Sequence, residues 1–114
     1  MEEMQKDRFC DIKIDGDALD VRFKREFLYE QPHLHMDFDE IDELVEKAES
    51  PQITVNMAGV VYISSVSLGW FFELAKNVRQ KSGHMKIVNS KKPIFESFTV
   101  VRLDNLVEIE KPAE

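Results

Sequence analysis

The chain has 114 residues, of which 43% are hydrophobic and 32% are charged, and its formal net charge is −7. This length and composition suit one compact soluble domain and exclude a disordered chain. The acidic balance disfavours binding to nucleic acids or anionic membranes, whose negative charge would repel the protein. Cys10 is the only cysteine, so a disulfide framework is excluded and a reducing compartment, the cytoplasm, is expected.

The two ends of the chain are expected to flank a single domain. Residues 1–8 are charged and lack the apolar stretch of a signal peptide, which predicts a flexible N-terminus. We expect residues 9–110 to form the domain and residues 111–114 to be a C-terminal tail, because neither a linker nor an internal repeat interrupts the sequence.

One uncharged stretch, between Glu49 and Glu73, is long enough to span a bilayer. It contains Pro51, Asn56 and three serines, and its first part is rich in β-branched residues. A buried strand followed by a buried helix explains this pattern better than a transmembrane segment.

The first ordered segment predicts a β-hairpin. Apolar residues alternate with charged ones over residues 10–15 and again over residues 19–24, which indicates two strands with one buried face. Asp15-Gly16 lies between them and can supply the positive φ angle of a tight turn.

The segment Lys24–His35 is expected to be an irregular loop, because Gln31-Pro32 interrupts any regular element. Its apolar cluster, Phe27-Leu28-Tyr29, is expected to tuck under the domain, with a docking surface as the alternative. The spacing of apolar residues then predicts a helix over residues 37–48, capped by Asp37 or Asp39.

The centre of the chain predicts a strand, a polar turn and a helix. The strand covers residues 52–56, the turn holds Ser64, Ser65 and Ser67, and an amphipathic helix follows. The buried stripe of this helix is expected to consist of Leu68, Phe71, Phe72, Ala75 and Val78.

The rest of the chain repeats the alternation of strands and helices. Ser82-Gly83 predicts the end of the central helix, and residues 84–88 predict a buried strand. Pro93 suits the first turn of another helix, and Leu106, Val107 and Ile109 predict a last strand. The predicted fold is α/β, a single small domain with one mixed sheet and helices packed on it.

The serine cluster has a structural and a functional interpretation. Ser64 or Ser65 can cap the helix that follows, which is worth about 1 kcal/mol. The cluster can equally be a site of chemistry or of partner binding. Trp70 lies off the buried stripe, and we expect either an exposed anchor for a partner or partial burial against the Phe27–Tyr29 segment.

At these residues the sequence resembles STAS domains, the fold of bacterial anti-sigma-factor antagonists. The family has an aspartate-serine-serine-glycine-leucine-glycine pattern after a central strand, and Ser64-Ser65-Val66-Ser67-Leu68-Gly69 occupies its place. Leu68-Gly69 match, and Ile87-Val88-Asn89 is similar to the family's leucine-valine-asparagine. The resemblance covers roughly residues 9–109 in element order and is specific over residues 60–89.

The resemblance implies a non-enzymatic protein that binds a partner, either an anti-sigma factor or a serine-kinase-like protein. The docking residues would be Ser64, Ser65, Val66, Ser67, Leu68, Gly69 and Trp70. In the family the second serine of the pattern accepts phosphate, and Val66 stands there without a hydroxyl. Ser65 and Ser67 are the remaining phosphorylation candidates. A non-switching STAS adaptor or scaffold in a transport or stress-signalling complex is the alternative.

Two other kinds of site carry weaker signals. Ser67 loosely echoes a serine-hydrolase nucleophile with His84 as base, but no acidic residue lies between them and the pattern lacks its first glycine. His33 and His35 are too few to indicate a zinc site. No nucleotide-binding or dinucleotide motif is present, so neither a metal nor a cofactor is expected.

Overall fold

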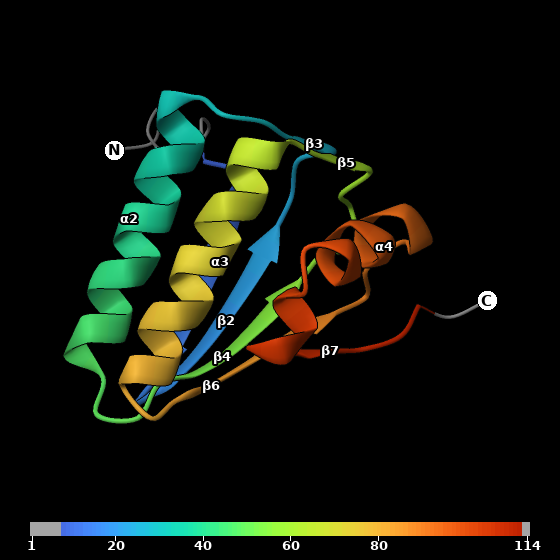
Figure 1. Cartoon of the computed structure of the whole chain (residues 1–114). Helices are drawn as coiled ribbons and strands as arrows, with labels where there is room; N and C mark the ends of the chain where they lie inside the picture. Colours follow the sequence, from blue (N-terminus) through green and yellow to red (C-terminus); the bar gives the residue numbers. More distant parts are fainter. Residues whose placement is uncertain (1–7, 113–114) are drawn as a thin grey trace.

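The computed structural model of the chain describes residues 8–112, which form a mixed sheet covered on one face by helices (Figure 1). The elements, in chain order, are β1 (Cys10–Asp15), β2 (Ala18–Phe23), β3 (Phe27–Leu28), α2 (Pro32–Lys47), β4 (Gln52–Asn56), β5 (Tyr62–Ile63), α3 (Ser65–Gln80), β6 (His84–Val88), α4 (Lys92–Val100), the 3-10 helix η1 (Leu103–Asn105) and β7 (Glu108–Ile109).

The main sheet has the strand order β1-β2-β4-β6-β7. The β1–β2 pair is antiparallel, and each later pair is parallel. Helices α2 and α3 lie side by side across one face, and α4 lies beside the sheet near β5 (Figure 1). The predicted α/β class, a single domain with a mixed sheet and packed helices, is therefore confirmed.

The predicted hairpin forms, and Gly16 adopts a φ of +60° in its tight turn. Leu19, Val21 and Phe23 of β2 are all buried. In β1 only Cys10 is fully buried, and Ile14 is 58% exposed. The alternation thus predicts the buried face of the inner strand β2 correctly but overstates the burial of β1, which is an edge strand of the sheet.

Helix α2 begins at Pro32 and not at Asp37. Proline has no N–H to lose in the first turn, so Pro32 starts this helix instead of interrupting it. The N-cap is Gln31, without a side-chain hydrogen bond, so the predicted caps Asp37 and Asp39 are wrong. Both lie inside the helix.

Asp37 is buried and fixes the start of β1. Its carboxylate accepts a hydrogen bond from the backbone N–H of Phe9 at 2.7 Å and lies 3.4 Å from Arg8 Nε. Arg8 also pairs with Glu40. Of the predicted flexible N-terminus, residues 1–8, only Arg8 lies within the described residues, and residues 1–7 lie outside them.

The segment Lys24–His35 is not an irregular loop. Its residues Phe27–Leu28 form β3, which pairs in parallel with β5 in a second, two-stranded sheet. Leu28 is buried as expected, whereas Phe27 and Tyr29 remain about half exposed. The expectation that this cluster tucks under the domain therefore holds for one residue of three.

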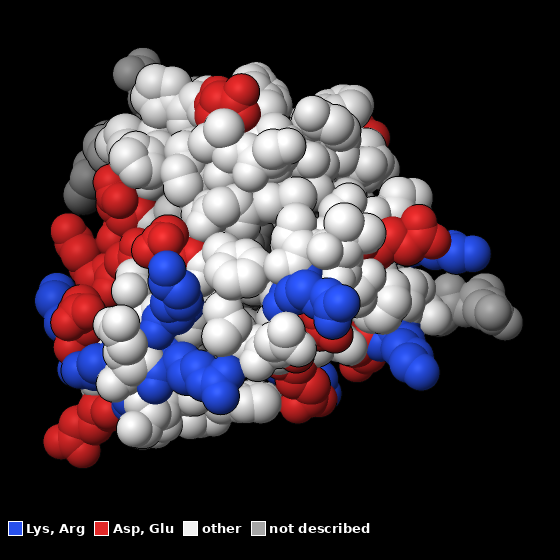
Figure 2. Space-filling view, in the orientation of Figure 1, with Lys and Arg blue, Asp and Glu red and all other residues white. Residues whose placement is uncertain are grey.

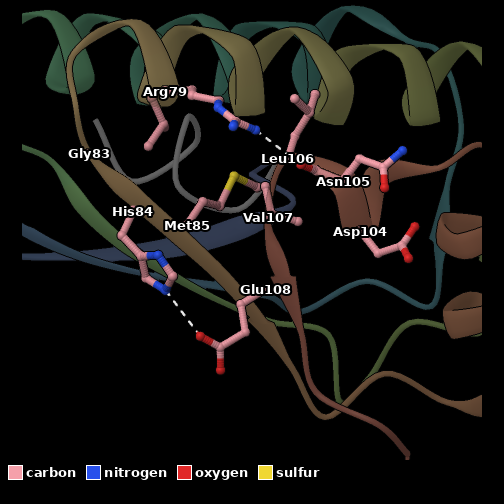
Figure 3. Close-up of a pocket in the computed structure, with 10 residues that line it drawn as sticks. Arg79, Gly83, His84, Met85, Asp104, Asn105, Leu106, Val107 and Glu108 are labelled. Carbon is pink, nitrogen blue, oxygen red and sulfur yellow. Dashed lines mark hydrogen bonds and ion pairs between the residues drawn. The ribbon is translucent and has the colours of Figure 1, made fainter.

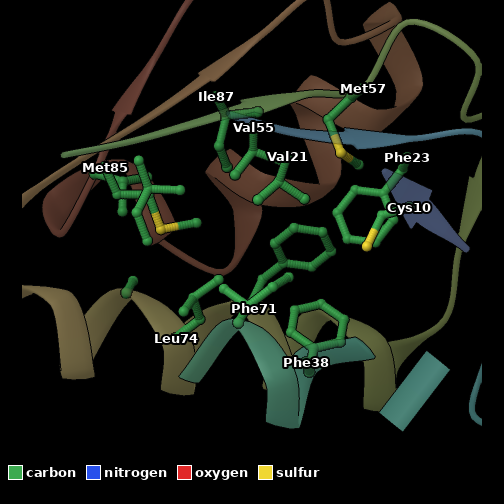
Figure 4. Packing of buried hydrophobic residues seen from close by; sticks show 14 of the residues in the cluster. Cys10, Val21, Phe23, Phe38, Val55, Met57, Phe71, Leu74, Met85 and Ile87 are labelled. Atoms are coloured by element: carbon green, nitrogen blue, oxygen red, sulfur yellow. The ribbon is translucent and has the colours of Figure 1, made fainter. Parts of the chain in front are cut away.

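The core lies between the main sheet and helices α2 and α3 (Figure 4). Phe71 is its centre, with ring centroids 5.5 Å from Phe23, 5.0 Å from Phe38 and 5.3 Å from Phe98. Each such buried ring contributes about 1.5–3 kcal/mol through the hydrophobic effect.

The buried stripe of α3 is rotated from the predicted one. Phe71, Ala75 and Val78 are buried as predicted, and Leu74 joins them. Leu68 and Phe72 are only partly buried and pack at the margin of the core.

Helix α3 ends at the predicted Ser82-Gly83 stop. Ser82 takes the left-handed conformation with a φ of +56°, and Gly83 N–H donates to the Val78 carbonyl at 2.9 Å. A Cβ on Gly83 would collide with the carbonyl oxygen of Pro51. Glycine is therefore needed here for close packing rather than for a positive φ.

The uncharged stretch between Glu49 and Glu73 folds into β4, β5 and the first half of α3. Among the described residues, no helix combines the length and the apolar character that crossing a membrane requires.

Candidate partner-binding surface

The serine turn is built around two hydroxyl groups that bind each other. Ser64 is the N-cap of α3, and its Oγ accepts a hydrogen bond from Ser67 N–H at 3.1 Å. The Ser64 hydroxyl donates to Ser67 Oγ at 2.9 Å. Ser64 is 7% exposed and Ser67 is fully buried. Both therefore stabilise the start of the helix from inside the molecule.

The chain does not run straight from the central strand into this turn. After β4, Asn56 Oδ1 accepts a hydrogen bond from Ala58 N–H at 3.0 Å, and the chain then pairs with β3 as β5. Ser64 N–H donates to the Leu28 carbonyl at 2.8 Å. The small second sheet thus fixes where α3 begins, a feature that sequence reasoning missed.

Ser65, Val66 and Gly69 are exposed on the first two turns of α3. Val66 is 47% exposed, so the position at which the resemblance predicts a phosphate acceptor lies at the surface but carries no hydroxyl. Of the two phosphorylation candidates, Ser65 is accessible to another protein, and Ser67 is not.

Several exposed apolar side chains gather next to this turn. We call them the apolar surface: Phe27 and Tyr29 from the β3 segment, Val61 and Tyr62 from the β5 segment, and Val66 from α3. Phe27 and Tyr62 are direct partners across the β3–β5 pair and are 54% and 50% exposed. In Figure 2 the upper region, over β3, β5 and the start of α3, is mostly white, with acidic side chains toward its edges. Apolar groups gathered at the surface in this way are typical of interaction sites.

Trp70 is partly buried, and its aromatic partners lie on α2. Its ring stacks on His35 at a centroid distance of 5.0 Å and lies 5.8 Å from Phe38. His35 is also 3.7 Å from Asp39. Trp70 is therefore not a fully exposed anchor, because α2 covers part of its ring.

His33 and His35 lie on α2 and not on a loop. Within residues 8–112, no group of three or more His, Cys, Asp or Glu side chains is placed to hold a metal ion.

A cleft of about 330 Å³ lies at the opposite end of α3, where β6 begins (Figure 3). In it His84 Nε2 lies 3.2 Å from Glu108 Oε1, and Arg79 donates to the Asn105 carbonyl at 3.0 Å. From Ser67 to the end of α3 is roughly 20 Å, at 1.5 Å per helical residue. Ser67 and His84 are thus not brought together, and the serine-hydrolase hypothesis for this pair is wrong.

The model of the STAS domain family matches residues 10–112. This match covers most of the chain, and the chain therefore belongs to the STAS domain family. Among proteins with curated descriptions, none matches the sequence.

Solved structures of low sequence identity share the fold. A candidate anti-sigma factor antagonist from Thermotoga maritima is 19% identical, with a TM-score of 0.72 over 92% of this chain and 88% of that chain. The anti-sigma factor antagonist SpoIIAA of Bacillus, in its unphosphorylated form, is 8% identical, with a TM-score of 0.70 over 91% of this chain and 89% of that chain.

The same fold also forms part of a membrane protein. The murine anion transporter Slc26a9 is 7% identical to this chain, with a TM-score of 0.65. The match covers 89% of this chain and 17% of the transporter. The same fold thus occurs both in small proteins and as part of a larger one.

Proposed function

We propose that this chain is a non-catalytic, cytoplasmic regulator of the anti-sigma-factor-antagonist type. It would dock through the segment Ser64–Gly69 onto a serine-kinase-like anti-sigma factor and so compete with a sigma factor. The observation that carries the proposal is the exposure of Ser65 and Val66 beside the other exposed side chains of the apolar surface. Interfaces of this kind have apolar centres from which charged residues are depleted.

Gly69 supports a close approach of the partner. It lies inside α3, and a Cβ added to it would meet no atom within 4 Å. A glycine inside a helix costs about 1 kcal/mol relative to alanine. The fold gains nothing from this residue, whereas a bare patch of helix backbone gives a partner room beside Val66.

The departures from the family pattern bear on regulation. Phosphate adds about −1.5 to −2 charges and would disrupt an apolar interface. Val66 cannot accept phosphate, and Ser67 is fully buried. The chain is therefore a constitutive binder unless its partner phosphorylates Ser65. Incubation with the partner kinase and ATP, followed by mass spectrometry, distinguishes the two, because only the switch adds phosphate to Ser65.

Docking is tested by placing a charge at the centre of the proposed interface. Val66→Asp should weaken binding to the purified anti-sigma partner at least about tenfold by isothermal titration calorimetry, because a buried unpaired carboxylate opposes association. The matched control is Gln80→Asp, which adds the same charge to the exposed far end of the same helix. Equal affinities for the two variants would contradict docking at Ser64–Gly69.

The second candidate is an adaptor or scaffold subunit of a transport or stress-signalling complex. The STAS module of the Slc26a9 anion transporter favours it. In that case the intact chain binds its complex with the same affinity whether or not ATP and a kinase are present. It would also show no competition with a sigma factor.

A further inference from the structure

The main sheet has one long edge strand. β1 has six residues and is paired on one side by β2, whereas the strand at the opposite edge, β7, has two residues. The outer side of an edge strand presents backbone N–H and C=O groups with which a further strand can pair. Very short edge strands avoid such pairing, so β1 is the edge of this sheet at which it can occur.

The hairpin determines which backbone groups of β1 face outward. Asp15 and Ala18 close its two-residue turn, and at the other end the Phe9 carbonyl accepts a hydrogen bond from Lys24 N–H at 2.8 Å. In an antiparallel pair only alternate residues exchange hydrogen bonds with the neighbouring strand. The odd-numbered residues of β1 therefore bind β2. The outward N–H and C=O groups are those of Cys10, Ile12 and Ile14, and among the described residues they have no other backbone partner.

Two isoleucines on this edge are incompletely covered. Ile14 lies opposite Leu19, on the sheet face that the helices cover, yet it is 58% exposed and Leu19 is 3% exposed. Ile12 lies on the same face and is only partly buried. The helices thus leave the outer margin of β1 open, and a strand added beside β1 would cover both side chains.

The opposite face of β1 carries charges in a self-complementary order. Asp11 and Lys13 lie on either side of Ile12. Two copies of β1 that run antiparallel, with Ile12 opposite Ile12, place Asp11 of each copy opposite Lys13 of the other. Ile12 is then at a hydrogen-bonded position, as its outward backbone groups require. Asp11 and Lys13 are at the position where facing side chains approach most closely.

Other registers of this strand pair are less favourable. Centring the pair on Asp11 or on Lys13 places that residue opposite its own copy, and like charges directly opposite each other are destabilising. Centring it on Ile14 places Lys13 opposite Asp15, but the turn that begins at Gly16 leaves only a short stretch to pair. The register centred on Ile12 pairs residues 10–14 of both copies.

We propose that this chain forms a symmetric homodimer in which two β1 strands pair antiparallel and join the two main sheets into one. The twofold symmetry makes the contact between Asp11 and Lys13 occur twice. Main-chain hydrogen bonds supply the affinity, and the order of charges sets the register. The docking segment Ser64–Gly69 lies on a different element, so this dimer does not depend on the proposed function.

The oligomeric state is measured by analytical ultracentrifugation of the intact chain over a range of concentrations. We expect a reversible equilibrium between one chain and two. Lys13→Asp should raise the dissociation constant of the dimer at least about tenfold, because Asp11 then faces a second carboxylate. The double variant Asp11→Lys/Lys13→Asp should restore it to near the parent value. Within one chain this variant places like charges opposite Arg22 and Asp20, so its recovery comes from the contact between chains.

Val66→Asp is the matched control, because it adds a carboxylate to the apolar surface, away from β1. It should leave the dissociation constant unchanged. A dimer that is weakened by Val66→Asp and not by Lys13→Asp forms through the apolar surface, which would overturn the proposal. A chain that stays monomeric at every concentration would overturn it as well. So would a double variant that circular dichroism shows to be folded but that does not recover the dimer.

Hydrogen exchange of the ¹⁵N-labelled chain locates the contact. Raising the protein concentration should slow the exchange of the outward N–H groups of Ile12 and Ile14, because these groups become hydrogen-bonded in the dimer. The N–H of Ser65, at the exposed start of α3, should exchange at the same rate throughout. Protection of Ile12 and Ile14 that is the same at every concentration would mean that the edge is covered within one chain, and the dimer would be excluded.

Discussion

At the scale of single residues, Ser64 and Ser67 depart together from the pattern that the chain resembles. Ser64 stands at the position of an aspartate and Ser67 at that of a glycine. The hydroxyl of Ser64 binds both the N–H and the Oγ of Ser67. The two differences therefore belong together. Ser64 replaces a longer aspartate side chain as the helix cap, and the hydroxyl of Ser67 gives it an additional hydrogen-bond partner.

Replacing the cap should destabilise the protein measurably. We expect Ser64→Ala to lower the free energy of unfolding by about 1 kcal/mol, because Ser67 N–H loses its acceptor. Ser64→Asp should retain most of the stability, since a carboxylate also caps a helix. Urea denaturation followed by circular dichroism measures both. Ser65→Ala is the control, because Ser65 is exposed and does not cap the helix. A loss for Ser65→Ala as large as that for Ser64→Ala would contradict the assignment of the cap.

At the scale of elements, the two ends of α3 use glycine for opposite reasons. Gly83 follows the helix and packs against the Pro51 carbonyl, which leaves no space for a side chain. Gly69 lies in the second turn with open space around it. The packing of the fold requires the first glycine, whereas the role proposed for the second is to leave space at the surface for a partner.

Alanine at these two positions should therefore have effects of opposite sign. Gly83→Ala should lower the free energy of unfolding by about 1–3 kcal/mol, because the β4 and β6 segments must move apart. Gly69→Ala should raise it by about 0.5–1 kcal/mol through better helix propensity. Chemical denaturation of both variants measures this difference. A stabilised Gly69→Ala variant that binds its partner as tightly as the parent would show that the space beside Val66 is not used.

The elements also differ in how well the sequence predicts them. The β1–β2 hairpin, β4, α3, β6 and α4 follow from hydrophobic periodicity, because each is long enough to show its period. The two-residue strands β3 and β5 have no period to detect, and their pairing depends on contacts between segments far apart in the sequence. The role of Asp37 is not predicted either, because its hydrogen bond with the Phe9 N–H joins residues 28 positions apart. From the local sequence alone, Asp37 has the pattern of a helix cap.

At the scale of the site, the sequence identified the turn but not what surrounds it. The exposure of Val66 and the burial of Ser67 depend on how α3 is rotated about its axis against the sheet. The predicted buried stripe was slightly rotated from the observed one, so the sequence could not tell which of these two neighbours faces the interior. Phe27 and Tyr62 become neighbours only through the second sheet. The apolar surface therefore could not be assembled from the sequence.

At the scale of the whole molecule, the interior protects the only cysteine. Cys10 is fully buried at the start of β1, and burial is the main cause that raises its pKa from 9.0 to about 12. Because the folded chain holds this proton more tightly than the unfolded chain, the stability it contributes is present below pH 9 and is lost as the pH rises toward 12.

The thiol should therefore react only when the domain opens. At pH 8 we expect Ellman's reagent to label the native chain far more slowly than the urea-unfolded chain, because both the thiolate and access to it are suppressed. The absorbance of the released thiolate measures both rates. Destabilisation by Gly83→Ala should accelerate labelling of the native chain. Equally fast labelling with and without urea would contradict the burial of Cys10.

The stacking of Trp70 on His35 gives the protein an optical reporter of its own. Trp70 is the only tryptophan in the chain, so its indole fluorescence comes from one place, between α2 and α3. That place is one helical turn from Val66. A protein that covers Ser65 and Gly69 alters the surroundings of the indole, and its arrival can be followed by emission from the unlabelled chain.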